Sequence, residues 1–177
     1  MQVRHYLIAL ALFAAGHAHA SDVDNIQQLI QSKQYGQALE RANQSLSANP
    51  KDAQLRYLKG ISQTELNQLD EAIRTFSALA NDLPHLSEPY NNLAVLYARQ
   101  NQLEKARTAL LLAIQTNPGY PVAHENLGDI YLRLASQSYE KSLQLGNSSD
   151  ALKGKLKQTL KIQGKPMPPV AAPPATR

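Results

Sequence analysis

The chain has 177 residues, a formal net charge of +4, no cysteine, no tryptophan and 43% hydrophobic residues. This length suits one domain of ordinary size, and the apolar content is too high for an extended disordered chain. The absence of cysteine excludes disulfide bonds, thiolate zinc sites, thiol nucleophiles and a lipid-modified cysteine. No apolar run approaches the roughly 20 residues of a membrane-spanning helix, so we expect a mostly helical, soluble protein.

Residues 1–20 have the pattern of a secretory signal peptide. A polar start at Arg4 precedes a ten-residue apolar stretch over 6–15, and the segment ends in small residues at Ala18 and Ala20. Signal peptides have this order of polar start, apolar core and small-x-small site. The alternative is an uncleaved anchor helix, but the apolar stretch is about half the length of a membrane span. We therefore expect cleavage after Ala20 and export, to the bacterial periplasm, with no lipid anchor.

A repeat of about 34 residues organises the chain after this segment. It is marked by equally spaced prolines and by an alanine twelve positions before each of them: Ala38 and Pro50, Ala72 and Pro84, Ala106 and Pro118. A fixed period of this length is typical of repeat proteins whose units stack on one another. Because proline has a fixed φ and no N–H, these prolines are expected to end the second helix of each unit.

The residues at fixed positions of these units resemble the tetratricopeptide repeat family, whose unit is two antiparallel helices. Residues 87–120 fit the family pattern best, with Tyr90, Leu93-Ala94, Tyr97, Ala106, Ala113 and Pro118 in place. The resemblance implies an all-α fold: a right-handed α–α superhelix of three to four helix-turn-helix repeats with a C-terminal capping helix. The expected repeats are 21–52, 53–86, 87–120 and a degenerate 121–148 within a domain over 21–148.

Small residues recur where the two helices of a repeat are expected to approach each other closely. These are Gly60, Ala94 and Gly128 in the first helix of successive repeats, with Tyr97 and Tyr131 expected to fill the remaining space. The fourth repeat departs from the pattern because only eight residues separate Tyr131 from Tyr139, where the third repeat has about thirteen. We expect a short second helix over 135–145. A continuous or bent helix over 122–145 is the alternative.

The C-terminal part carries the excess of positive charge. Residues 21–150 have 11 Lys and Arg against 14 Asp and Glu, whereas residues 151–177 have six basic residues and no acid. We expect a basic capping helix over 149–163 with its leucines on one stripe, followed by a proline-rich disordered tail over 164–177. Three interpretations of the tail stay open: a simple end, a weak contact with anionic membrane or cell-wall polymer, or a proline-rich ligand. Nucleic-acid binding is not expected.

No pattern in the sequence indicates catalysis or a bound cofactor. His124-Glu125 and Asp129 superficially resemble a zinc motif, but the second histidine that the motif needs is replaced by Gly128. His124 takes the aromatic core position of its repeat, and we expect a packed, hydrogen-bonded imidazole there. His85 follows a proline in a turn and is expected at the surface. The expected protein is therefore not an enzyme and holds no metal.

The resemblance also implies a peptide-binding groove lined by the first helix of each repeat. Transferred position by position, its residues are Tyr57, Ile61, Glu65, Glu88, Asn91, Asn92, Val95, Arg99, Glu125, Asn126, Asp129 and Arg133. Asn92 and Asn126 take the position from which the family commonly hydrogen-bonds a peptide backbone, a task for which an amide offers both donor and acceptor. The paired cations with which some members bind a terminal carboxylate are absent, so the charge of the groove is mixed.

The function expected from these features is that of a scaffold. It would hold an extended peptide or a helix of a protein partner in the concave groove, in envelope assembly. A membrane- or wall-associated assembly factor acting through the tail is the alternative, and an accessory subunit of an envelope enzyme is the alternative from another class. The sequence leaves the partner and the oligomeric state open.

Overall fold

The computed structural model describes residues 17–164, which form eight α-helices without a strand. The helices are α1 (His17–Gln31), α2 (Tyr35–Ala48), α3 (Ala53–Glu65), α4 (Leu69–Asp82), α5 (Ser87–Arg99), α6 (Leu103–Thr116), α7 (Pro121–Gln144) and α8 (Asp150–Ile162). The expected all-α fold is confirmed. Residues 1–16 and 165–177, which hold most of the expected signal peptide and tail, lie outside the described residues.

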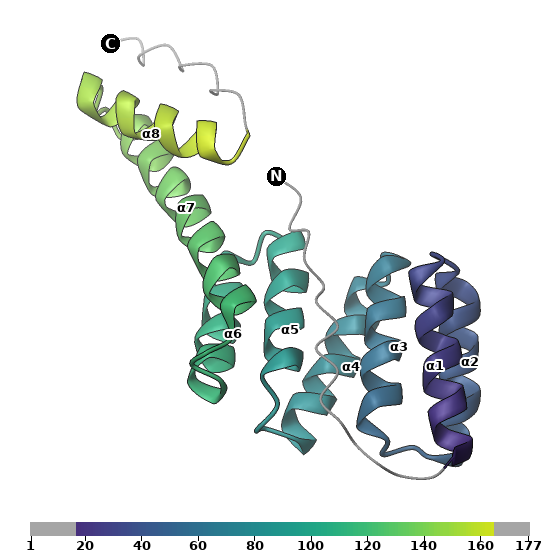
Figure 1. Cartoon of the computed structure of the whole chain (residues 1–177). Helices are drawn as coiled ribbons and strands as arrows, with labels where there is room; N and C mark the ends of the chain where they lie inside the picture. Colours follow the sequence, from purple (N-terminus) through teal and green to yellow (C-terminus); the bar gives the residue numbers. More distant parts are fainter. Residues whose placement is uncertain (1–16, 165–177) are drawn as a thin grey trace.

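The first six helices form three antiparallel hairpins that stack side by side. Helices α1, α3 and α5 form one layer, with α2, α4 and α6 in a second layer behind it (Figure 1). One continuous apolar core joins the layers, and its fully buried side chains include Leu55, Leu58, Phe76, Leu96 and Leu110. Each second helix ends two residues before a repeat proline, at Ala48, Asp82 and Thr116. The expected role of the prolines at the helix exits matches this arrangement.

Within each hairpin, the chain reverses at a residue in the left-handed conformation. These residues are Lys33, Asn67 and Asn101, with φ of 61°, 59° and 58°, and they take the same position in successive repeats. Asparagine tolerates this conformation better than most residues, because its short polar side chain bonds locally. The next residue then donates its amide to a carbonyl of the preceding helix, as Gln102 does to Tyr97 at 2.8 Å. This reversal is what makes each unit a hairpin.

The fourth unit lacks this reversal, and α7 is one continuous helix of 24 residues. The position that matches Asn101 is occupied by Ala135, whose Cβ makes the left-handed conformation cost roughly 1–2 kcal/mol. Lys33 shows that a residue with a Cβ can take this conformation, so the shorter spacing of Tyr131 and Tyr139 also matters, because it leaves fewer residues for a reversal and a second helix. The short second helix expected over 135–145 is therefore wrong, and the alternative of a continuous helix is observed.

The missing second helix changes the surroundings of three residues of α7. A Cβ on Gly60 would lie 2.6 Å from the Phe76 ring, as expected for a close approach, but a Cβ on Gly128 would meet nothing within 4 Å. Tyr131 is 48% exposed rather than packed. His124 is exposed as well, with Nε2 2.9 Å from the carbonyl oxygen of Pro118. The close packing expected for these three residues of α7 was wrong because no second helix covers them, whereas the hydrogen bond expected for the His124 imidazole is present.

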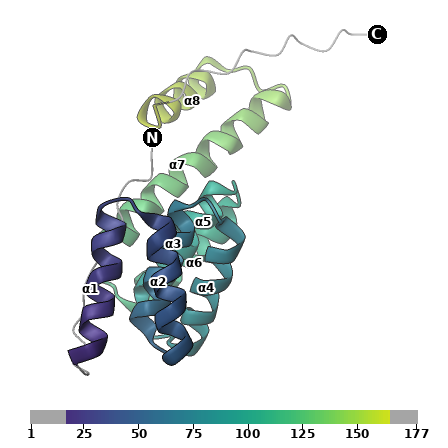
Figure 2. The ribbon, with the colours of Figure 1, turned by 90° about the vertical axis from the view of Figure 1, so that its right-hand side faces the viewer.

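The final helix α8 folds back along the far half of α7 (Figure 2). Ser149 caps it by accepting a hydrogen bond from the Leu152 amide, and Leu152, Leu156 and Leu160 are buried, as the leucine stripe predicts. At its end, Gln163 donates to the Leu132 carbonyl at 3.1 Å and lies 2.6 Å from the Ser136 hydroxyl. The C-terminal end of α8 is thus fixed to the middle of α7.

Candidate functional site

The twelve groove residues expected from the repeat alignment all lie on α3, α5 and α7, the first helices of their repeats. We call the face formed by α1, α3, α5 and α7 the A-helix face. Ile61 and Val95 are 3% and 4% exposed, so they lie beneath this face rather than on it. The polar members divide into residues that tie the helices together and residues that stay at the surface.

The asparagines of the A-helix face bond to the helix of the preceding repeat. Asn92 Nδ2 donates to the Tyr57 hydroxyl at 3.1 Å and to the Glu88 carbonyl at 2.9 Å, and Asn126 Nδ2 donates to Asn91 Oδ1 at 2.9 Å. These three asparagines are 3–9% exposed. Because buried polar groups need partners, these bonds hold α3, α5 and α7 in register. A peptide backbone would have to compete with these bonds for the same amides.

Two arginines repeat the same pattern, Arg99 at the C-terminal end of α5 and Arg133 in the middle of α7. Arg99 donates to the Thr64 carbonyl at 3.1 Å, and Arg133 donates to the Ala98 carbonyl at 3.0 Å. Each of these bonds spans 35 residues, one repeat plus one position. Arg133 also donates to Asn101 Oδ1 at 3.2 Å, which joins the middle of α7 to the turn between α5 and α6. These guanidinium groups therefore have structural partners.

Carboxylates form the surface part of the A-helix face. Glu65, Glu88 and Asp129 are half-buried and Glu125 is exposed. Burial raises the pKa of Asp129 because it disfavours the charged carboxylate, and the negative charge of the nearby Glu125 raises it further by repulsion. Burial and the Glu88 charge raise the pKa of Tyr120 to about 12. Four acids stand against two arginines among the twelve residues, so their summed formal charge is −2.

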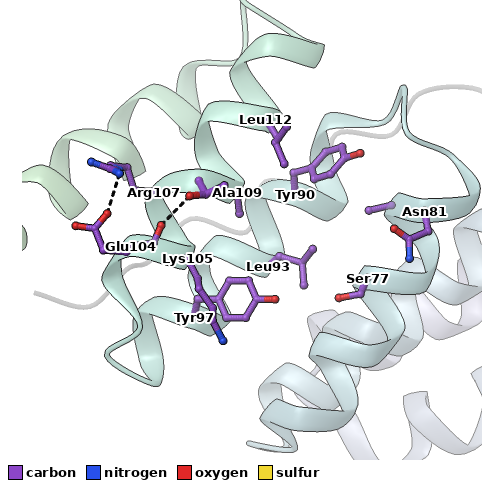
Figure 3. A pocket seen from close by; sticks show the side chains of 12 residues that line it. Ser77, Asn81, Tyr90, Leu93, Tyr97, Glu104, Lys105, Arg107, Ala109 and Leu112 are labelled. Carbon is purple, nitrogen blue, oxygen red and sulfur yellow. Dashed lines mark hydrogen bonds and ion pairs between the residues drawn. The ribbon is translucent and has the colours of Figure 1, made fainter.

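A pocket of about 440 Å³ lies between α4 and α6, on the side of α5 that is opposite to the A-helix face. We call it the α4–α6 pocket. Tyr90, Leu93 and Tyr97 line its floor along α5, and Leu112 of α6 forms part of its wall (Figure 3). Lys105 Nζ lies 5.6 Å from the centre of the Tyr97 ring, close enough for a cation–π contact. This pocket is therefore aromatic and apolar inside with polar groups at its edge.

Sequence reasoning missed this pocket because it treated Tyr90 and Tyr97 only as family positions. The matching positions of the preceding repeat are Arg56, Lys59 and Gln63. There, Arg56 pairs with Asp82 at 2.7 Å and Gln63 accepts from the Thr75 hydroxyl at 2.7 Å. Comparing these positions between repeats would have revealed the change from polar to aromatic residues.

Neither a metal centre nor a membrane span is found within residues 17–164. No group of three or more His, Cys, Asp or Glu side chains in this range could hold a metal ion. Likewise, none of the described helices combines the length and the apolar character needed to cross a bilayer.

Helical hairpins that stack at a constant sequence period define this protein as an α-solenoid. Family models described as "Tetratricopeptide repeat" match residues 29–90 and 87–120. The chain belongs to the tetratricopeptide repeat family.

A curated relative is the tetratricopeptide repeat domain-containing protein PYG7, chloroplastic, of Arabidopsis thaliana. It is 32% identical over 147 residues, and the match covers 68% of this chain and 48% of the relative. The chain thus spans about half the length of this relative.

Three solved structures share the fold at low sequence identity. The crystal structure of TTC0263, a tetratricopeptide repeat protein of Thermus thermophilus, has a TM-score of 0.62 and 23% identity, covering 82% of this chain and 83% of that one. The Yersinia enterocolitica type III secretion chaperone SycD, with a peptide of the translocator YopD, has a TM-score of 0.61 and 17% identity, covering 67% and 96%. The second such domain of human RPAP3, in complex with the HSP70 peptide SGPTIEEVD, has a TM-score of 0.59 and 16% identity, covering 63% and 93%.

Proposed function

We propose that this protein is an interaction scaffold that holds an extended, positively charged segment of a partner protein on its A-helix face. The observation that carries the proposal is that the polar side chains of that face fall into two groups, those bonded to a neighbouring helix and the carboxylates. Asparagines and arginines bond neighbouring helices, while the carboxylate residues Glu88 and Asp129 are half-buried and Glu125 is exposed. The fold supports an interaction role, because the SycD and RPAP3 structures each contain a bound peptide.

The carboxylates would act on the ligand mainly through charge. Glu125 and Asp129 lie one turn apart on α7, and burial and Glu125 raise the Asp129 pKa. A lysine or arginine placed between them would relieve this repulsion. Contacts of this kind at a partly exposed surface set partner choice and association rate more than affinity. Binding should therefore weaken as salt is added, because ions screen exposed charges over about 10 Å at 0.1 M.

The test compares peptides of equal length that are lysine-rich, neutral or glutamate-rich, with binding measured by isothermal titration calorimetry. We expect the lysine-rich peptide to bind most tightly, and Glu125→Gln to weaken it several-fold. The matched control is Glu71→Gln, which removes the same charge from an exposed residue of α4 that pairs with Arg74 at 3.0 Å. Equal binding of all three peptides, or an equal loss in both variants, would refute the proposal.

Export to an envelope compartment forms the second part of the proposal and rests on the pattern of residues 1–20. Helix α1 begins at His17, so cleavage after Ala20 would shorten it by four residues. Its buried apolar residues Val23, Ile26 and Ile30 all follow that point, so cleavage would leave them in the helix. N-terminal sequencing of the protein purified from its natural source is expected to begin at Ser21. A first residue before position 17 would contradict the proposed cleavage.

A further inference from the structure

The α4–α6 pocket has the chemistry of a site for a proline-rich segment. Its floor presents Tyr90, Leu93 and Tyr97, which lie three and four residues apart and therefore share one side of α5. In Figure 3, Leu93 lies between the two tyrosine rings. Extended proline-rich segments bind aromatic-lined grooves of this kind, because their conformation is already restricted before they bind. A volume of about 440 Å³ is within the usual range of ligand pockets.

The aromatic lining of this pocket is not shared by the preceding repeat. In the preceding repeat, the matching positions carry Arg56, Lys59 and Gln63. Two of these side chains have partners within the fold, Asp82 and the Thr75 hydroxyl. A ligand that needs aromatic surface would therefore bind between α4 and α6 and not at the matching place between α2 and α4.

The chain itself contains a segment of the required composition. Residues 165–177 include five prolines together with Met167 and Val170: Pro166, Pro168, Pro169, Pro173 and Pro174. The segment carries only two charged residues, Lys165 and Arg177, at its two ends. Its middle is therefore uncharged and able to enter an apolar pocket without burying a charge.

Hydrogen bonds connect the start of this segment, through α7, to the turn beside the pocket. Gln163 is held to the Leu132 carbonyl and to Ser136, in the middle of α7. The neighbouring Arg133 bonds to Ala98 and Asn101, at the turn that joins the helices of Tyr97 and Lys105. Thirteen residues in the polyproline conformation span about 40 Å, at roughly 3.1 Å per residue. A covalent connection of this length gives an effective concentration near the millimolar range, so a weak contact is sufficient.

We infer that residues 165–177 dock in the α4–α6 pocket of the same chain, with proline rings packed against Tyr90 and Tyr97. This interaction lies on the opposite side of α5 from the A-helix face and does not depend on the proposed function. A partner protein with a proline-rich segment would then have to displace the chain's own segment to use the pocket.

The test uses the full chain and exploits its lack of cysteine. Ala172→Cys gives a single attachment point for a nitroxide spin label in the middle of the proline-rich segment. We expect the label to broaden the NMR signals of amides at the pocket, including Leu93, Tyr97 and Ala109, by severalfold more than those of α1 and α2. A second labelled chain, in which all five tail prolines are serine, should lose this difference while its helices stay folded.

Two further samples complete the design. Tyr97→Ala should reduce the broadening, whereas Tyr131→Ala, at an exposed tyrosine of α7 outside the pocket, should leave it unchanged. A mixture of labelled chains with isotope-enriched unlabelled chains should show no broadening. The inference is overturned by broadening in that mixture, by broadening centred on Glu125 and Asp129, or by signals that are equal throughout the molecule.

Discussion

Glycine at position 60 is the point at which the packing of the solenoid can be tested most sharply. A Cβ at this position would lie 2.6, 2.8 and 2.9 Å from three atoms of the Phe76 ring. Phe76 is fully buried and its ring contacts the Tyr57 ring edge to face, at 5.6 Å between centroids. The phenyl group therefore has no open space into which it can move. Gly60→Ala should force it, and the helix that carries it, out of place.

The magnitude follows from two opposing terms. Overpacking of a filled core costs about 1–3 kcal/mol, and distances below 3 Å to a buried ring place this substitution near the upper end. Alanine gains about 1 kcal/mol over glycine in a helix interior. We therefore expect Gly60→Ala to lower the free energy of unfolding by about 2 kcal/mol. Gly128→Ala is the matched control, because it stands at the same repeat position with nothing within 4 Å. It should raise stability by about 1 kcal/mol.

Urea denaturation followed by circular dichroism measures both variants, and the difference between them is expected to be about 3 kcal/mol. For a chain of this size, thermal melting should separate the two by about 6–12 °C. Combining Gly60→Ala with Phe76→Leu should recover part of the loss, giving a favourable coupling in a double-mutant cycle. If Gly60→Ala stabilises the protein as much as Gly128→Ala does, the close approach between α3 and α4 is refuted.

Three further predictions concern the turns, the ties between repeats and the ionisation of Tyr120. Asn101→Ala should lower the free energy of unfolding by about 1–2 kcal/mol in urea denaturation, because alanine is strained at a φ of 58°; an unchanged midpoint would contradict this. Asn126→Ala should cost about 1–3 kcal/mol by the same measurement, since it removes the bond to Asn91; a neutral effect would show that this tie contributes nothing. Folding raises the Tyr120 pKa from 10.0 to about 12, so its contribution to stability is complete below pH 10 and is lost as the pH rises toward 12. Tyr120→Phe should remove that part of the pH dependence measured by thermal melting, and an identical profile would count against it.

The repeat period was readable from the sequence because each unit uses the same packing at the same position. Pro50, Pro84 and Pro118 end helices for one physical reason, and their equal spacing gives the period directly. From the sequence, a continuous helix over 122–145 was only the alternative to a short second helix. Two signals pointed to it: the short spacing of Tyr131 and Tyr139, and Ala135 at the position where Lys33, Asn67 and Asn101 take the left-handed conformation.

The candidate site was predictable in position but not in the use of its side chains. The alignment correctly assigned Asn92 and Asn126 to the first helices, yet whether these residues bind a peptide stays a prediction. Their hydrogen bonds to Tyr57 and Asn91 depend on the distance between neighbouring helices, which no local pattern encodes. The α4–α6 pocket was missed for a similar reason, since it depends on three helices from two repeats.

The ties across the A-helix face have a consequence for how such a protein can diverge. Substitution of Asn91, Asn126 or Arg133 alters both the surface and the alignment of the helices, so each of these positions is constrained by ligand binding and by helix packing together. None of the hydrogen bonds described above joins the carboxylate of Glu88 or Glu125 to a neighbouring helix. We therefore expect the solenoid to stay assembled when the charge at these two positions is reversed. New ligand preferences should therefore arise by exchange of the acidic residues, on a framework of amides and guanidinium groups that is held constant.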